Sequence, residues 1–571
     1  GHSRFKWVLC GDLAVRGAET YTIEYLKGLE RDGNPTPRDR DPRSAYLARN
    51  VRIGHTQGAA DKLPGRSKIY NTSLPAGATR PGHILGLTEA RIAGSDIFCG
   101  VISTNDLTVQ QFGTVTYSGG PPPAWSFNEK HPAGFANFAC PVNRRFSFAV
   151  LNNLLIISDH GVSVLKQFDG NADITSLTVV NGPEYARYLI TVRDYMFAAY
   201  TRDTGAANLF PYRIRWCDAG NPNAWTATNY WDLTARSTAI ATVTESDAIT
   251  GLGAIQDLVV GFKRDSIHVG AFTSQPPYFF FETIVPDKGN LSPFAIVPIG
   301  NMLTFVWKDG IYVFDGSPIP RKISGKKISH HLVTGLKEAN LWQIWASKHP
   351  FKPEVWFCTQ EDSYPTWIYN YETDDWFQSS LNYECLGIAR RIVRLTWNDL
   401  LTDPRYTWDS VRFKDGDRTW DKAFNSTVSE EIMMGGGTSE VGTDQAILYE
   451  VDSGVYQDVG QGGNTAVMTA TWRSQPTDCG LPNKMKRVLG ATVKVAPLAA
   501  TLTVRLYVDG TQAGGNVSAT VAFSGADYDE ITVYFNAVGV SFQLEIENAI
   551  ATESFRILGV SLNYIPREDI R

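Results

Sequence analysis

The sequence lacks the short motifs that mark the commonest catalytic and nucleotide-binding sites. Its 571 residues contain no Walker loop, no G-x-S-x-G nucleophile elbow and no H-E-x-x-H zinc helix. The seven cysteines stand far apart, so they form neither a CxxC metal knuckle nor a recognisable disulfide framework. We therefore predict reduced and mostly buried thiols, no cofactor, no metal site and no catalytic residue.

An excess of one charge and long apolar runs are also missing. Lys and Arg number 53 against 59 Asp and Glu, a net charge of −6, which argues against a surface built to grip phosphate backbones. No run of about 18 apolar residues could span a membrane, and the start Gly1–Lys6 has no apolar signal-peptide core. We expect a protein made and folded in a cytoplasm, which disfavours an extracellular adhesion protein.

A strand phrase recurs along the middle of the chain. In each copy a turn-forming Asn or Asp stands directly before a short apolar run, and the copies begin at Asn153, Asp194, Asp257 and Asn301. Their spacing is close to the ~40–50 residues of one four-stranded propeller blade. Three copies are followed by a turn that leads into an alternating strand, at Asp159–Val164, Asp265–Val269 and Asp309–Val313. The sequence thus predicts an all-β protein built around a β-propeller.

The two ends of the chain differ from this repeated region. Residues 1–84 are polar and interrupted by Pro and Gly, which predicts an irregular N-terminal arm that docks on another surface, with a short helix over Thr20–Leu29. The propeller is predicted over 85–455, with an inserted Trp-Asp hairpin region at about 397–431. Residues 456–571 alternate apolar and polar positions over several strands, which indicates a C-terminal antiparallel β-sandwich.

Several segments could carry chemistry, and each has a simpler structural interpretation. Asp218–Trp225 approximates the Asp-box turn of glycosidase propellers, but its Trp falls two places late, so a structural turn is favoured. The adjacent His330 and His331 would point to opposite faces of a strand and would not chelate one metal ion. Gly435–Gly437 lacks the Lys and helix of a phosphate cradle, so a flexible linker is favoured.

Aromatic and basic clusters are similarly ambiguous. Pro276–Phe281 and Trp342–Trp345 could line a carbohydrate cleft, although aromatic residues in strands more often fill a core. The arginine pairs Arg213/Arg215 and Arg390/Arg391 could face DNA, but such pairs are usually ion-paired at a surface. The loops Arg264–Ser266 and Lys308–Gly310 are candidate contacts with partners, or ordinary hairpin tips.

Two phrases in the propeller region resemble tail proteins of double-stranded DNA phages. Tyr212–Trp225 is similar to the pattern hydrophobic-R-W-S-x-x-G-x-P-x-x-W, with Cys217 at the serine position, and Leu303–Gly316 is similar to a strand-turn-strand that ends in GIYVFDG. Ala48–Val51, Leu63–Arg66 and the Thr-Trp-Asp echo near Asp409 and Asp421 also look similar. The chain therefore resembles the tail nozzle, tail tubular or packaged-DNA stabilisation family of short-tailed phages.

That resemblance implies a structural role in the virion and no enzymatic activity. It implies a β-propeller subunit of a homo-oligomeric, six-copy ring below the portal adaptor, which retains packaged DNA, gates its ejection and carries fibres or spikes. A carbohydrate-active or carbohydrate-binding propeller is the alternative. Paired carboxylates in one cleft would favour that alternative.

Overall fold

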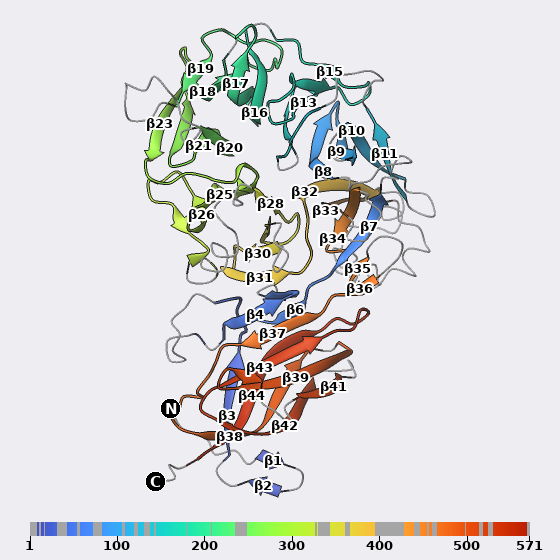
Figure 1. Cartoon of the computed structure of the whole chain (residues 1–571), viewed down its shortest axis with the longest axis vertical. Coiled ribbons are helices and arrows are strands. Elements are labelled where there is room, and N and C mark those ends of the chain that lie inside the picture. Colours follow the sequence, from blue (N-terminus) through green and yellow to red (C-terminus); the bar gives the residue numbers. More distant parts are fainter. Residues whose placement is uncertain are drawn as a thin grey trace, which may run out of the picture. The chain divides into compact units, whose positions relative to one another are not determined.

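The structure, a computed structural model, consists mainly of strands (Figure 1). It describes residues 8–10, 13–15, 18–30, 41, 43–53, 58–71, 83–105, 109–118, 124–130, 138–141, 144–179, 181–206, 208–233, 248–325, 328, 343–359, 366–393, 428–438, 446–453, 456–459, 465–496, 498–512, 518–523 and 529–567. The chain divides into two compact units. The first unit comprises residues 1–67, 234–383 and 451–571, and the second comprises 68–233 and 384–450.

The second unit contains three antiparallel four-stranded blades in its described residues. Neighbouring strands are consecutive in the chain, which is the meander connection of propeller blades. The blades are β8 (Ile84–Ile92), β9 (Ser95–Asn105), β10 (Val109–Ser118) and β11 (Ala124–Glu129); β12 (Ser147–Leu151), β13 (Leu154–Ser158), β14 (Lys166–Phe168) and β15 (Thr175–Ser176); and β16 (Pro183–Val192), β17 (Tyr195–Asp203), β18 (Phe210–Trp216) and β19 (Tyr230–Asp232). Strands β32 (Cys385–Val393), β33 (Val428–Thr438) and β34 (Ala446–Val451) follow later in the chain.

The first unit contains three blades of the same kind among its described residues. The short 3-10 helix η3 (Pro293–Ala295) lies just before the second of them, and its Phe294 stacks on Trp345 at the start of the third, with ring centroids 4.9 Å apart. The blades are β20 (Ile249–Ile255), β21 (Leu258–Lys263), β22 (Ile267–Phe272) and β23 (Phe279–Val285); β24 (Pro298–Ile299), β25 (Met302–Trp307), β26 (Gly310–Phe314) and β27 (Arg321–Lys322); and β28 (Trp345–Lys348), β29 (Glu354–Cys358), β30 (Thr366–Asn370) and β31 (Asp375–Ser379).

Apolar side chains hold neighbouring blades of each unit together. In the second unit one buried cluster joins Leu151 and Ile156 to Leu189 and Met196, from two successive blades. In the first unit the ring of Phe262 packs 5.6 Å from that of Phe305, in the next blade. Both faces of these strands are covered, which explains why the repeated phrases are short continuous apolar runs rather than strict alternations.

The C-terminal part of the first unit is an antiparallel β-sandwich. One sheet contains β37 (Ala470–Ser474), β43 (Phe542–Asn548) and β39 (Ala500–Val508), with β40 (Thr511–Gln512) and β41 (Ser518–Phe523) on β39. The other contains β42 (Asp529–Gly539), β38 (Lys486–Val495) and β44 (Arg556–Pro566). Buried and half-buried positions alternate strictly along β39, as a strand with one buried face requires.

The fold class predicted from the sequence is therefore confirmed: the protein is all-β, with a β-propeller and a C-terminal sandwich. The four repeated phrases form β13, β17, β21 and β25, the second strand of four blades. The turns before three of these strands use left-handed residues, with φ of 59° at Asn153, 53° at Arg193 and 52° at Gln256.

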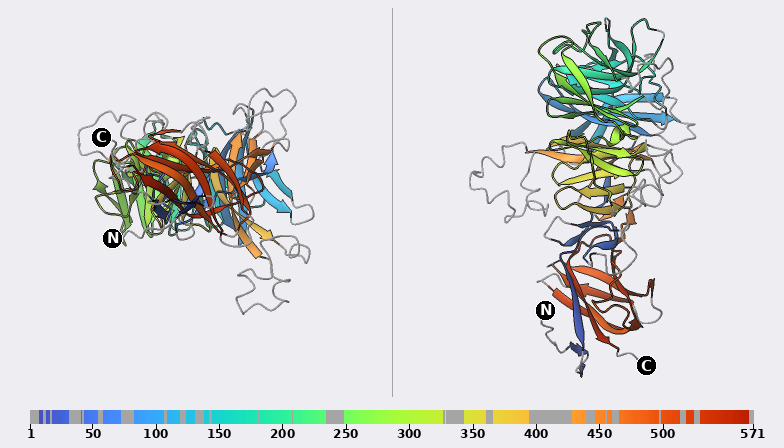
Figure 2. Two further views of the ribbon diagram at one scale, coloured as in Figure 1. Left: turned by 90° about the horizontal axis from the view of Figure 1, so that it is seen from below. Right: turned by 90° about the vertical axis from the view of Figure 1, so that its left-hand side faces the viewer.

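The N-terminal segment lies on the chain's own sandwich as short strands (Figures 1 and 2). Strand β3 (Glu19–Glu24) pairs antiparallel with β44, and β4 (Ala45–Arg49) pairs with β37. Strand β6 (Ala60–Lys62) pairs with both β44 and β5 (Val51–Ile53). Before these come β1 (Val8–Cys10) and β2 (Leu13–Val15), and after them β7 (Arg66–Asn71), which pairs with β35 (Gln457–Val459), itself paired with β36 (Thr465–Val467).

The helix predicted over Thr20–Leu29 is wrong. The apolar spacing that suggested it is real, since Leu26 and Leu29 are buried, but Glu19–Glu24 is extended. The edge of β44 offers the backbone of this segment a complete hydrogen-bond ladder from Glu19 to Glu24, and this tertiary pairing overrides a weak local preference.

The strand predicted directly after Asp159 begins later, at Lys166. The carboxylate of Asp159 accepts hydrogen bonds from the backbone N–H groups of Val162 and Ser163, and also from that of Ala139. Because the Asp159 carboxylate accepts hydrogen bonds from the amides of Val162 and Ser163, the chain turns at this point instead of pairing with the neighbouring strand.

The linker predicted at Gly435–Gly437 is also wrong. These residues lie within β33, where Gly435 pairs with Leu386 and Gly436 with Cys385. A Cβ at Gly436 would lie 2.6 Å from Cβ of Ile84, so close packing of a neighbouring strand explains the glycine. Most of the Trp-Asp region predicted at about 397–431 lies outside the described residues, and its last residues belong to β33.

We predict that Asp159→Ala lowers the free energy of unfolding by about 1–3 kcal/mol, because it leaves three backbone amides, those of Ala139, Val162 and Ser163, without their acceptor. Asp169 is the matched control, since its exposed carboxylate accepts from the N–H groups of Asn171 and Ala172, in the same blade. Asp169→Ala should cost about 0.5–1 kcal/mol. Urea denaturation of the full chain checks both values, and equal losses would contradict this account of the turn.

Candidate functional site

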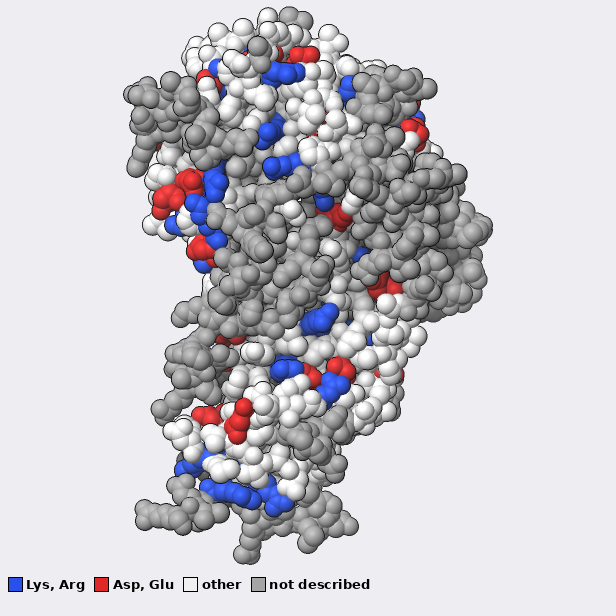
Figure 3. All heavy atoms as spheres, in the orientation of Figure 1, with Lys and Arg blue, Asp and Glu red and all other residues white. Residues whose placement is uncertain are grey.

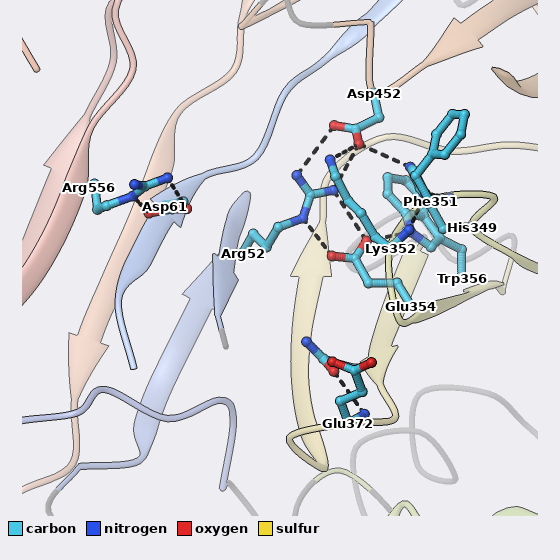
Figure 4. A network of polar contacts seen from close by, with 11 residues as sticks. Arg52, Asp61, His349, Phe351, Lys352, Glu354, Trp356, Glu372, Asp452 and Arg556 are labelled. Atoms are coloured by element: carbon cyan, nitrogen blue, oxygen red, sulfur yellow. Dashed lines mark hydrogen bonds and ion pairs between the residues drawn. The ribbon is translucent and has the colours of Figure 1, made fainter. Parts of the chain in front are cut away.

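A set of buried charges lies in the first unit, around Arg52 (Figure 4). Arg52 of β5 donates from Nε to Oε1 of Glu354 at 2.6 Å and from Nη2 to Oδ2 of Asp452 at 3.1 Å. Lys352 also binds the Asp452 carboxylate. The side chains of Arg52, Glu354 and Asp452 are at most 5% exposed. A segment near the N-terminus, the start of a blade strand and the segment after β34 therefore meet at one ionic cluster.

His349 completes this cluster as a neutral imidazole. Its Nδ1 accepts from the backbone N–H groups of Phe351 and Lys352, both at 3.2 Å, so the ring proton lies on Nε2. That Nε2–H donates to Oδ2 of Asp452 at 3.1 Å. With both cations protonated, two positive and two negative charges balance, and Trp356 adds an N–H bond to Glu354.

The electrostatics of the cluster keep the carboxylate of Asp452 ionised. Burial alone would raise the pKa of Asp452, but Arg52, His349 and Lys352 together hold that pKa well below its usual range. Burial, reinforced by Arg52, lowers the pKa of Lys352. A carboxylate that stays ionised and is enclosed by its own partners cannot act as an acid toward a substrate. The cluster therefore joins segments of the fold.

A second charged cluster lies in the second unit and is partly open to solvent. Arg390 of β32 lies 3.4 Å from Glu89, 2.9 Å from Asp96 and 3.0 Å from Glu431. Burial and the neighbouring carboxylates Asp96 and Glu431 raise the pKa of Glu89, while Arg390 opposes them. Three carboxylates around one guanidinium leave excess negative charge, and one of them holds its proton more tightly than an ordinary glutamic acid.

The arginine pairs noted in the sequence are ion-paired, as favoured. Arg213 binds Asp232 through Nε at 2.7 Å and stacks between Phe210 and Tyr230, and Arg215 binds Asp203 at 2.9 Å. Arg390 is held as described above. The side chain of Arg391 lies outside the described residues.

The Asp-box-like segment forms a structural turn, as favoured. Oδ1 of Asp218 accepts from the Thr226 hydroxyl and the Asn229 side-chain amide, at 2.9 and 3.1 Å. Trp225 is buried, and its indole N–H donates to the carbonyl of Pro222.

The remaining sequence candidates do not come together into one site in the described residues. Phe279 and Phe281 are core residues and only Phe280 between them is exposed, so Pro276–Phe281 does not form an aromatic cleft wall by itself. The two loops considered as partner contacts touch each other, since Nζ of Lys308 lies 2.9 Å from Oδ1 of Asp265. Trp342, His330 and His331 lie outside the described residues.

Six cysteines are buried and form no disulfide, as predicted. They are Cys99, Cys140, Cys217, Cys358, Cys385 and Cys479. Burial raises the pKa of the Cys99, Cys217 and Cys358 thiols to about 12, which keeps them protonated and unreactive near neutral pH. Across the described ranges, no group of three or more His, Cys, Asp and Glu could hold a metal ion. No helix in those ranges is long and apolar enough to cross a membrane.

Comparisons with known proteins find likeness only at the level of structure. No protein-family model and no curated protein matches the chain. An exo-β-1,3-galactanase from Phanerochaete chrysosporium is 11% identical, with 88% of this chain and 100% of that one covered and a TM-score of 0.28. An α-L-arabinofuranosidase from Fusarium graminearum is 10% identical, with 68% and 98% covered and a TM-score of 0.32. A gluconolactonase from Xanthomonas campestris is 12% identical, with 59% and 97% covered and a TM-score of 0.30.

These likenesses concern the fold alone, and none of these three proteins is a tail protein. They nevertheless contradict the prediction that the chain is not an enzyme, because two of the similar structures are glycoside hydrolases. That prediction is withdrawn. The resemblance to tail nozzle proteins remains an expectation.

Sequence reasoning missed both charged clusters. Glu354 stands at the head of a strand that is otherwise Val-Trp-Phe-Cys, and a carboxylate in such a strand must be buried with a cation. That pattern signals a partner without identifying Arg52, which is 302 positions away. Arg390 had been noted only for its neighbour Arg391, and its three acidic partners come from strands distant in sequence.

We predict that Arg52→Met lowers the free energy of unfolding by about 3–5 kcal/mol, because it leaves Glu354 and Asp452 buried without their main counter-charge. Arg556→Met is the matched control. Arg556 binds Asp61 through two nitrogens but is 37% exposed, so its loss should cost less than about 1 kcal/mol. Urea denaturation monitored by tryptophan fluorescence checks the difference, and similar losses in the two variants would contradict it.

Proposed function

We propose that this protein is a subunit of the tail nozzle, or hub, of a short-tailed double-stranded DNA phage. In this proposal six copies form a ring at the distal end of the tail tube, below the portal adaptor. The ring retains packaged DNA, gates its exit and attaches fibres or spikes. The proposal makes no claim against an enzymatic activity on the same subunit.

The observation that carries the proposal is the Tyr212–Trp225 phrase. The tryptophans that the phrase shares with tail proteins, Trp216 and Trp225, are both buried, and Gly220 donates its N–H to the carbonyl of Asp194. The shared residues thus build one compact turn of a blade. Shared residues that stabilise the same turn support common ancestry better than the same number of identical residues scattered along the chain.

The distribution of charge is consistent with a passive conduit. On the face seen in Figure 3, the described Lys and Arg atoms lie in separate groups among Asp and Glu, and the whole chain carries a net charge of −6. Continuous basic walls would hold DNA through counterion release, whereas a mixed surface lets it slide.

We predict that the purified full chain adds to isolated portal-adaptor tails as a ring at their distal end. Single-particle imaging of the mixture measures this, with tails alone as the control. A ring of about six copies is the expected closed assembly. A protein that stays monomeric and does not decorate the tails would contradict the proposal.

A carbohydrate-active propeller is the second candidate, and the Arg390 cluster favours it. Glycosidases use two carboxyl groups in different protonation states, and the raised pKa of Glu89 beside Asp96 and Glu431 offers such a pair. Glu89 would be the general acid, and Asp96 or Glu431 would be the second carboxyl group.

For this candidate we predict that Glu89→Gln reduces sugar release at least about 100-fold, since an amide cannot donate the proton. Glu129→Gln, an exposed change in the same blade, is the control. The measurement is reducing-sugar release from β-1,3-galactotriose and from bacterial surface polysaccharide. Because Glu89 must be protonated, activity should fall as pH rises through its raised pKa. No release from either substrate, or equal release by Glu89→Gln, would contradict the candidate.

A further inference from the structure

A pair of stacked arginines lies on one hairpin of the second unit, β16–β17. Cζ of Arg187 lies 3.6 Å from the ring centroid of Tyr200, and Cζ of Arg202 lies 3.5 Å from that of Tyr185. Tyr185 and Arg202 are direct cross-strand partners in the register of the hairpin. The sequence encodes the arrangement as Tyr-x-Arg on each strand, at Tyr185–Arg187 and Tyr200–Arg202.

Neither arginine is ion-paired or hydrogen-bonded to the part of the chain that the structure describes. In this they differ from Arg213 and Arg215 on the next strand of the same blade, which bind Asp232 and Asp203. A guanidinium stacked on a tyrosine ring is fixed in orientation, while the N–H groups around its edge stay available. Such an edge fits the oxygens of a phosphate group through two parallel hydrogen bonds.

A buried histidine without partners lies next to this pair. His160 is 4% exposed, and among the described residues neither ring nitrogen has a hydrogen-bond partner. Its ring stands edge-on to Tyr188, with centroids 5.8 Å apart. The turn that carries it packs on β16, because the Ser158 hydroxyl donates to the carbonyl of Ala186 and a Cβ at Gly161 would lie 3.3 Å from Cγ of Arg187.

The environment of His160 is positive. Burial, helped by Arg187 and Arg144, lowers the pKa of His160 to about 2, so the ring is neutral near pH 7 and has one N–H to donate. Both ring nitrogens are closed to solvent, so His160 itself offers no hydrogen bond to a group from outside the chain. Arg144 acts on the same ring as Arg187, so it adds to the positive potential near the arginine pair.

We propose that Arg187 and Arg202 bind a phosphate oxyanion, either free or within a nucleic acid backbone. Arg187 is two residues from Tyr185 on β16, and the ring of Tyr185 carries the guanidinium of Arg202, so the two arginines occupy neighbouring positions of one hairpin. The proposal does not depend on the tail function, because a free phosphate would use the same donors.

The test is binding of inorganic phosphate to the full chain by isothermal titration calorimetry at low salt. Arg187→Gln and Arg202→Gln should each weaken phosphate binding at least tenfold. Arg187→Lys should also weaken it, because an ammonium keeps the charge but loses the planar edge. Arg193→Gln is the matched control: it removes the same charge from the exposed tip of the same hairpin and should leave binding unchanged. Circular dichroism of each variant confirms that it is folded.

A second experiment distinguishes free phosphate from the phosphate of a nucleic acid backbone as the ligand. Fluorescence anisotropy with a short double-stranded DNA should give binding whose salt slope falls by about one in Arg187→Gln if the backbone is the ligand. Phosphate binding without DNA binding assigns the site to a small anion. Absence of phosphate binding to the unmodified chain, or an equal loss in Arg193→Gln, would overturn the proposal.

Discussion

A guanidinium in a protein interior requires a counter-charge, and in the first unit this requirement links segments that are hundreds of residues apart. Arg52 comes from the N-terminal segment, Glu354 opens a blade strand, and Asp452 stands just before the sandwich. Each is enclosed, so none can be moved to water without leaving the others unpaired. The strands β3–β6 then extend from this point along the sandwich, where they pair with β37 and β44. The sandwich therefore depends on both ends of the chain.

Local chemistry made much of the fold predictable. Turn residues before apolar runs located β13, β17, β21 and β25, because a left-handed turn and a short buried strand leave a direct trace in sequence. The failures came from long-range effects. The edge of β44 turned a helical pattern at Thr20–Leu29 into a strand, and the close approach of Ile84 placed Gly436 inside a sheet instead of a linker. The side chain of Asp159 delayed a strand by capturing its amides.

The candidate sites were less predictable, because a charge has a function only through its partners. Arg213 and Arg187 look alike in sequence, each beside aromatic residues in a strand of one blade. Asp232 neutralises the first, whereas the described residues offer the second no carboxylate. Glu89 likewise acquires its raised pKa from burial and from Asp96 and Glu431. The four-stranded blades of the chain itself establish the propeller fold, and the prediction that the chain is not an enzyme is withdrawn.

Native-state hydrogen exchange of the unmodified chain tests most directly whether the Arg52 cluster joins its segments into one cooperative unit. If it does, the slowest amides of β5, of β29 and of residues 451–453 should exchange through a common opening with the same free energy. Their protection should also fall together as denaturant is added. An opening of β5 at a much lower free energy than β29, with the blade left fully protected, would contradict this account.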